Sequence, residues 1–524
     1  MTLKRLLLAT GLTSILAVGV FGLWLESKSG VSSQELSLAV LYLALGALAP
    51  LWTTLIRRIG FMRWAGRLAS WCHSRWMSWR RRFWIGTGIL TALLLTTWTA
   101  GEVWSRAVLR EEMAKALDLG PLDFQQLLPP MPLADENGCP ELIRASELMT
   151  ARASRARGNA EASWFWEAGN SKAFSSSTPW SPKEIQIAGD ALGSAEEILT
   201  LIRQGADRPH IRHTLDTNGM LLGLKLQHLK HLLRTGALLQ AAARVEMENG
   251  NADQALSDLG RASRIGKSLE EEPILISHLV DMALKGKACD GVGDVLQKSP
   301  RTSQAVLSKL SEALRMDARA YHQALLGERC FGVDAIDRLT AGDSIPGDMD
   351  AAGMPEFREL SMLSLPLRPW LRWQKAVYLR MFTDLIPRAE TPGRPLVLEQ
   401  DIPRLALLPR LLIPVMDKAR IATLKNRARC NATRWALAVL QHRMKTGKLP
   451  ASLDEIATEL IPDRPTDPWM PGKPFVYRPE ADGSAFALYS LGENQADDGG
   501  DFVQKPVPNR GNVAPDLGVR WKVR

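Results

Sequence analysis

The sequence predicts a multi-domain protein. It would have three N-terminal transmembrane helices, an all-α helical bundle or short repeat region, and a small α+β domain near the C-terminus. Three long apolar runs at the N-terminus, helix-period apolar patterns over 181–330, and two strand-like runs before an acidic loop support this fold class. At 524 residues the chain is long enough for several domains.

The order of these patterns divides the chain into six segments. They are a membrane region over 1–104, a helix and aromatic-rich connector over 105–180, a helical bundle over 181–330, a loop-rich insertion with an amphipathic helix over 331–412, an α+β domain over 413–505, and a C-terminal tail over 506–524.

The membrane region contains apolar runs near 6–25, 36–56 and 83–100, each as long as a bilayer-spanning helix. Between the second and third runs, the window 57–82 holds eight arginines and no acidic residue. By the positive-inside rule this window faces the cytoplasm, and 101–524 lies outside. A cleaved signal peptide is the alternative for the first run.

The same charge distribution predicts where the protein works and what it contacts. The net charge of +9 is concentrated beside membrane runs, so it indicates topology and not a nucleic-acid partner. We expect a multi-pass protein of the inner (cytoplasmic) membrane with a periplasmic bulk. Its partners would be the lipid bilayer and other envelope proteins.

Four cysteines fall in the predicted extracytoplasmic part, namely Cys139, Cys289, Cys330 and Cys430. Such a compartment permits disulfides, and four cysteines allow three pairings. No CxxC spacing is present, which argues against a zinc or thioredoxin-like site. Bridges and buried free thiols both remain open.

Helical signals dominate the middle of the chain. A helix is expected to stop at Gly120-Pro121, and breaks at Gly250 and two prolines favour short turns between antiparallel helices. The segments around Gly250 resemble one tetratricopeptide-type hairpin, and a plain bundle is the alternative. Further helices are predicted from Pro369 and over 415–446.

Among the side chains of the helical region, two pairs of histidines are the pattern most typical of an enzyme. His210 and His213, and likewise His228 and His231, are three residues apart and would share a helix face, where two imidazoles can hold a metal. No HExxH, GxSxG, Walker-type or GxGxxG motif accompanies them. Histidines beside an apolar helix face are the structural alternative, so we assign no catalytic residue.

The acidic loop SLGENQADDGGD offers more specific chemistry. It places Asn494, Asp497, Asp498 and Asp501 close together among glycines that permit tight turns. Hard oxygen ligands of this kind suit Ca²⁺. The EF-hand pattern fails at Ala496, and on composition alone a solvated turn is the alternative.

The stretch 430–502 resembles the soluble domain of the G-type major pseudopilin of type II secretion. The motifs that carry the resemblance are a long helix, GKLP with SLDE, DPW, PFVY and LYSLG, followed by the acidic loop. The resemblance implies a calcium site formed by the Leu491 carbonyl, the Asn494 side chain, the Ala496 carbonyl, and the Asp497 and Asp498 carboxylates.

The N-terminus differs from a pilin. A pilin has G-F-T-L-x-E after a short basic leader, whereas this chain begins MTLKRLLLATGLTSIL. The domain is therefore expected to be a tethered module and not a processed filament subunit. As a whole, the chain looks like membrane-anchored proteins of planctomycete-type bacteria that join spans, a helical region and a pseudopilin-like domain.

Together these features predict a membrane-anchored, non-catalytic envelope protein that serves assembly or secretion-like protein contacts. The alternative is an exported hydrolase that uses a His/acid cluster of the helical region.

The arginine-rich window predicts the topology directly. A periplasm-dependent reporter such as alkaline phosphatase should be active when fused after Thr99 and inactive when fused near Gly66, because only the first position is expected outside. Reporter activity in whole cells measures this. The reverse pattern would rule out the predicted orientation.

Overall fold

The computed structural model describes residues 65–156, 164–166, 180–299, 302–341, 360–389, 391, 402–502, 505–507, 511–513 and 516–522. The chain divides into two compact units, Met1–Thr96 and Thr97–Arg524. The predicted spans near 6–25 and 36–56 lie outside the described residues.

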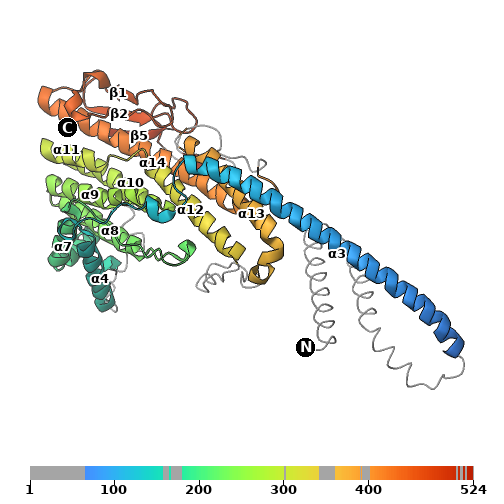
Figure 1. Ribbon diagram of the computed structural model, residues 1–524. Coiled ribbons are helices and arrows are strands. Elements are labelled where there is room, and N and C mark those ends of the chain that lie inside the picture. The colour runs from blue at the N-terminus through green and yellow to red at the C-terminus, as the bar shows by residue number, and fades with distance from the viewer. Residues whose placement is uncertain are drawn as a thin grey trace. The chain divides into compact units, whose positions relative to one another are not determined.

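Helices make up most of the described chain, and a small sheet lies near its C-terminal end (Figure 1). The α-helices are α3 (Ala65–Asp118), α4 (Cys139–Ala156), α6 (Pro182–Gly193), α7 (Glu196–Asp207), α8 (Gln227–Glu248), α9 (Ala252–Lys267), α10 (Leu275–Lys298), α11 (Gln304–Ala313), α12 (Ala320–Ala341), α13 (Leu360–Leu385) and α14 (Leu407–Thr446). The strands are β1 (Val476–Pro479), β2 (Ala485–Ser490), β3 (Lys505–Val507), β4 (Gly511–Val513) and β5 (Leu517–Lys522).

The third predicted span lies within helix α3. Among the described residues, the stretch Arg82–Asp118 is the one helical segment long and apolar enough to cross a membrane, and its apolar window is not buried by the rest of the chain. Large apolar side chains such as Trp84 and Leu94 are 63% and 61% exposed. Covering these side chains with lipid would remove that apolar area from water.

The end of α3 is fixed by an internal arginine. Arg329 of α12 is fully buried, and its guanidinium donates hydrogen bonds to the carbonyls of Ala116, Gly120 and Pro121 at 2.7–2.9 Å. Carbonyls at a helix C-terminus lack partners within the helix, and a cation there satisfies them. The helix stop predicted at Gly120 is confirmed, since α3 ends at Asp118.

The predicted helical bundle over 181–330 is confirmed in its main parts and differs at one start. Helix α8 begins at Gln227, about ten residues later than the apolar pattern predicts. The preceding stretch buries Leu221 against Phe124 and Phe331, and the Leu221 N–H donates to the Asp334 carboxylate at 2.9 Å. These contacts with distant residues compete with helix formation in the stretch before Gln227, so α8 begins late.

The prediction of a loop after residue 330 is wrong for residues 331–341. Helix α12 continues to Ala341, because Phe331, Val333, Ile336 and Leu339 fall on its buried side. Residues 342–359 lie outside the described residues. The helix predicted from Pro369 begins earlier, at Leu360, and becomes α13.

The C-terminal part contains a three-stranded antiparallel sheet of order β1-β2-β5, in which Phe486 pairs with Trp521. Residues 506–524 are therefore not a simple tail, because they supply strand β5. Trp521 is 3% exposed and packs edge-on against Phe486 with ring centroids 6.1 Å apart. A short strand with one buried aromatic residue gave too weak a pattern to be predicted.

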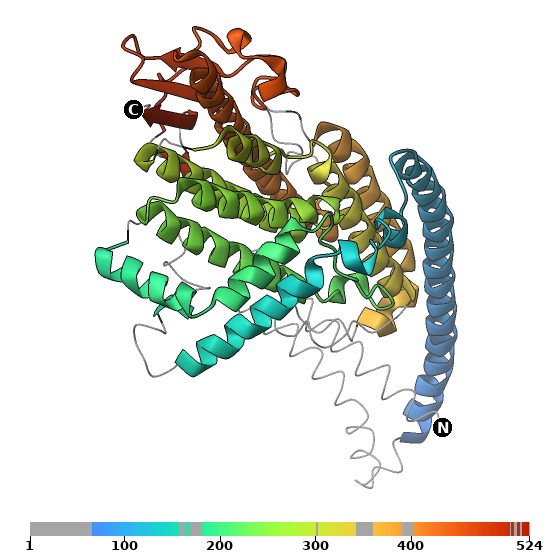
Figure 2. The same ribbon diagram turned by 90° about the vertical axis from the view of Figure 1, so that its left-hand side faces the viewer.

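One hydrophobic core joins the bundle to the sheet. Helix α14 contributes Trp435 and Val439 to a cluster that also holds Leu259 and Leu296 of the bundle and Phe486 of the sheet. Figure 2 shows α14 between the green bundle helices and the red strands. The domain boundary predicted at 412/413 falls inside this continuous helix.

A buried group of charges lies beside this core. The Lys285 ammonium contacts the Asp281 carboxylate at 2.9 Å and is also bonded to Glu270, and all three side chains are nearly or fully buried. Burial raises the pKa of Asp281 to about 7, and the neighbouring Glu270 charge adds to this. One ammonium thus faces two carboxylates.

We expect this group to make stability depend on pH. Because the folded-state pKa of Asp281 is raised, its contribution is full below pH 4 and is lost as the pH rises through about 7. The Asp281→Asn variant should lack this loss, a difference on the order of 2 kcal/mol between pH 5 and pH 8. Thermal unfolding of the full chain in detergent at both pH values measures it.

The matched control is Asp190→Asn, which changes an exposed acid on α6 and should keep the pH dependence of the parent protein. Equal pH dependence in the parent and in Asp281→Asn would contradict the prediction.

Candidate functional site

The acidic loop predicted as a metal site follows strand β2 and is anchored by the DPW motif. The Asp467 carboxylate is 2% exposed and accepts hydrogen bonds from the Trp469 N–H, the Ser490 hydroxyl and the Leu491 N–H at 2.7–3.1 Å. The motif therefore holds the start of the loop against the sheet.

Positive φ angles at Gly499 and Gly500 then turn the loop back toward strand β5. A Cβ at Gly500 would come within 3.1 Å of the Arg520 guanidinium and 3.3 Å of the Tyr489 ring. Glycine is required there for both its conformation and its size.

The predicted metal ligands of this loop bond mainly to other protein groups. The Asp497 carboxylate accepts from the Tyr489 hydroxyl at 2.9 Å and pairs with Arg478 at 2.6 Å. The Asn494 amide donates to the Asp498 carboxylate at 2.7 Å. The backbone N–H of Gly499 and the arginine lower the pKa of Asp497.

Asp516 was missed by sequence reasoning and lies next to this loop. Its side chain is fully buried, and one carboxylate oxygen accepts from the Gly500 N–H at 2.8 Å. For the other oxygen, no hydrogen-bond partner is found among the described residues. Burial raises the pKa of Asp516, and the nearby charges of Asp498 and Asp497 add to this. An unpaired buried carboxylate oxygen is costly and is satisfied by a cation.

The side chains of the acidic loop have oxygen atoms of the kind that bind a hard cation, but they do not form a metal-binding cluster. Within the described residues, no group of three or more His, Cys, Asp and Glu side chains could hold a metal ion. Arg478 supplies the positive charge beside Asp497. The calcium site therefore stays a prediction, with the ligands Leu491, Asn494, Ala496, Asp497 and Asp498. The unpartnered carboxylate oxygen of Asp516 supports it.

The four predicted histidines separate into different environments, and the shared helix face predicted for His210 and His213 is wrong because residues 208–213 are not helical. The rings of His213 and His228 stack with centroids 4.6 Å apart, and His228 lies 3.0 Å from the Glu272 carboxylate. His231 contacts the Ser146 hydroxyl at 3.0 Å. Because His228 and Glu272 are only 1% and 7% exposed, they form a buried contact that a substrate does not reach.

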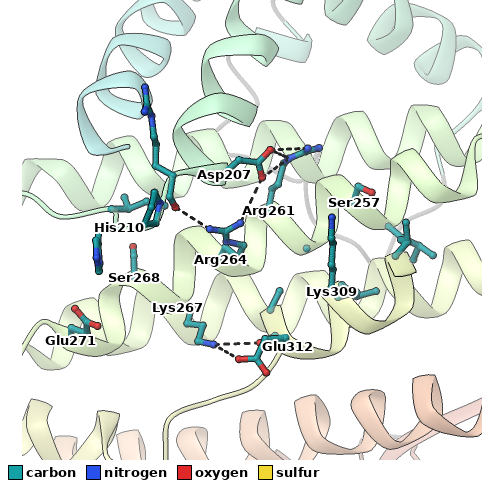
Figure 3. A pocket seen from close by; sticks show the side chains of 18 of the residues that line it. Asp207, His210, Ser257, Arg261, Arg264, Lys267, Ser268, Glu271, Lys309 and Glu312 are labelled. Carbon is teal, nitrogen blue, oxygen red and sulfur yellow. Dashed lines mark hydrogen bonds and ion pairs between the residues drawn. The ribbon is translucent and has the colours of Figure 1, made fainter. Parts of the chain in front are cut away.

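His210 instead lies in an open groove on the helical bundle, shown in Figure 3. The groove has a volume of about 700 Å³ and runs between helices α9 and α11, with the segment 207–212 closing one side. Its apolar lining includes Ile211, Leu256 and Leu310. Six cationic side chains and three acidic ones surround this lining, which leaves an excess of three positive charges: Arg208, Arg212, Arg261, Arg264, Lys267 and Lys309, with Asp207, Glu271 and Glu312.

Most of these cations are held by neighbours. Arg261 bonds the Asp207 carboxylate at 2.9–3.1 Å, and Lys267 pairs with Glu312 at 3.0 Å. No ion pair or hydrogen bond is found for the Lys309 side chain among the described residues, and Figure 3 shows it apart from the acidic groups. Within the part of the chain that the structure describes, the groove therefore has ion-paired charges on its walls and leaves Lys309 available to a ligand.

Sequence reasoning did not find this groove. Its basic residues are spread over helices α9 and α11 and the non-helical segment 208–212, and solvent-facing charges on such helices are typical of any soluble helix. Only the packing of α9 beside α11 gathers them on one surface.

Comparison of the chain with protein-family models, with curated proteins and with solved structures found no match. Its function is therefore inferred from the geometry of the chain itself.

We expect calcium to stabilise the acidic loop. In the full chain in detergent, Ca²⁺ should raise the unfolding temperature above that in chelator. At a concentration 100-fold above Kd, the gain is about 2.7 kcal/mol. The Asp516→Asn variant and the Asp497→Ala, Asp498→Ala double variant should lose the rise, because each removes oxygen donors.

The control is Asp454→Asn, an acid whose side chain is 97% exposed outside this loop. It should retain the calcium effect. An unchanged melting temperature of the parent protein in Ca²⁺ would remove the metal assignment.

Proposed function

We propose that this chain is a membrane-tethered, non-catalytic binding protein of the bacterial envelope that holds an acidic segment of a partner protein in the basic groove. The observation that carries the proposal is the open groove between α9 and α11, with its excess of positive charge and with Lys309, which has no partner among the described residues. Carboxylates of a partner would satisfy this charge, and its apolar side chains would pack against Val306, a partly exposed apolar residue of the lining.

The interleaved acids favour a peptide over a nucleic acid. Asp207, Glu271 and Glu312 lie among the cations and would repel the closely spaced phosphates of a nucleic-acid backbone. An extended peptide places side chains alternately on two faces, so its carboxylates can meet the cations while apolar residues face the groove floor. The groove therefore suits a peptide that carries both acidic and apolar side chains.

A second cavity of about 690 Å³ extends the surface available to such a segment. Lys267 and Glu271 line both cavities, so the two share a wall. The second one reaches helix α14 at Arg427 and Arg434. Together they give a binding segment contacts with both the bundle and the C-terminal part.

The proposal also includes a membrane anchor and a C-terminal domain that serves assembly contacts. Exposed apolar side chains over Arg82–Asp118 support a membrane-spanning helix, and the arginine-rich window supports a periplasmic Thr97–Arg524 unit. The motif order over 430–502 supports a pseudopilin-like C-terminal domain with a calcium loop. Such a domain on a tether suits assembly contacts better than filament formation.

A charge reversal in the groove tests the proposal. The full chain in detergent should bind a fluorescein-labelled peptide of eight glutamates more tightly than one of eight glutamines, as measured by fluorescence anisotropy. Lys309→Glu should weaken binding about fivefold, equivalent to roughly 1 kcal/mol, because it replaces the available cation with a like charge.

The matched control is Lys230→Glu, which reverses an exposed lysine on α8 outside the groove. It should leave binding within twofold of the parent protein. Equal weakening by both variants, or equal binding of the two peptides, would show that the groove has no specific role.

A further inference from the structure

Two cysteines far apart in sequence meet in the core that joins the bundle to the C-terminal part. Cys289 of α10 and Cys430 of α14 are 141 residues apart, and their sulfur atoms lie 3.6 Å from each other. Both side chains are buried, at 3% and 0% exposure. The contact is direct, with no atom between the two sulfurs.

Cys139 and Cys330 have no such neighbour. They lie in different clusters, and no sulfur–sulfur contact is found for either among the described residues. Burial raises the pKa of Cys139 to about 12 and that of Cys330 to about 11, which keeps both as unreactive thiols. The geometry thus selects one of the pairings that the sequence leaves open.

We propose that Cys289 and Cys430 are a modification site, at which a disulfide forms and joins helix α10 to helix α14. A disulfide has a sulfur–sulfur distance of about 2.05 Å, so the two atoms need to approach by only about 1.5 Å. Small side-chain rotations supply such a movement. The inference concerns the core and is independent of the basic groove.

The oxidant is a low-molecular-weight or protein disulfide. The Cys289 thiolate attacks one sulfur of the oxidant and releases its first thiol. The Cys430 thiolate then attacks the Cys289 sulfur of the mixed disulfide and releases the second thiol. The two protons of the cysteines end on the two released thiols, so the protein is oxidised by two electrons and the oxidant is reduced by two.

The folded surroundings make the two thiols unequal in acidity. A hydrogen bond from the Cys430 thiol lowers the pKa of Cys289, and the positive charge of Lys285 acts in the same direction. The same pairing raises the pKa of Cys430. In the folded chain Cys289 is therefore the more acidic of the two thiols. Because both sulfurs are buried in the folded chain, the exchange takes place while the core is still open.

The bridge would fix a wall of the second cavity. Arg427 and Arg434 line that cavity from α14, within a few residues of Cys430, while Lys267 lines it from the bundle. A covalent link between α10 and α14 prevents these two sides from separating. The loop it closes is long, and long loops give the largest entropic stabilisation.

Peptide mapping tests the pairing. The full chain in detergent is unfolded and refolded with oxidised and reduced glutathione, and free thiols are then alkylated without reduction. Trypsin releases Ala288–Lys298 and Cys430–Arg434, each with a single cysteine. We expect these two peptides linked to each other. Their recovery as separate alkylated peptides, or linked to other cysteines, would overturn the proposal.

Variants give an independent measurement. The Cys139→Ser, Cys330→Ser double variant should retain the link, whereas Cys289→Ser should leave Cys430 open to alkylation. Reductant should lower the unfolding temperature of the parent protein by about 5 °C and leave that of Cys289→Ser unchanged. An equal effect of reductant on both would count against the bridge, and the peptide map of the parent protein decides even where a variant fails to fold.

Discussion

The buried face of helix α14 is the constraint on which the Thr97–Arg524 unit depends. Its side chains close the core of the helical bundle and also cover the three-stranded sheet, so one helix completes both structures. Trp435 shows this double role, since it lies in the shared core and its indole N–H donates to the Pro465 carbonyl at 2.8 Å. Protein interiors are close-packed, so neither part can exclude water without this helix.

Polar contacts fix the position of the same helix along the core. The Arg434 guanidinium is 3% exposed, binds both oxygens of Asp463 at 2.7–2.8 Å, and donates to the Ser311 carbonyl at 3.0 Å. Apolar packing tolerates small shifts, whereas a bidentate ion pair is satisfied in only one register. The arginine thus sets how α14 meets both α11 and the C-terminal turns, and thereby the shape of the second cavity.

Local patterns predicted what local forces determine. The helix stop at Gly120, the turn at Gly250 and the end of α14 at Gly447 followed from residue type alone, and each is present. Features set by distant residues were not predictable. The late start of α8 depends on Phe331, more than a hundred residues further along the chain.

The candidate sites divide in the same way. The acidic loop is contiguous in sequence and was found by its composition, but its buried neighbour Asp516 lay in an assumed tail. The basic groove was missed because its cations become neighbours only when α9 packs beside α11. The sequence gives the number of cysteines but not their pairing, because the spacing of cysteines along the chain carries no information about which helices meet.

The most strongly perturbed ionisable groups of the described chain lie away from the accessible groove. Catalytic groups need shifted pKa values together with access to substrate. Here the large shifts lie inside the core, where burial raises the pKa of Asp281 to about 7 and lowers that of His278 to about 3. The accessible groove instead presents guanidinium and ammonium groups, which attract and orient an anion, together with His210 and the carboxylates of Asp207, Glu271 and Glu312. Its excess of positive charge supports the proposed binding role.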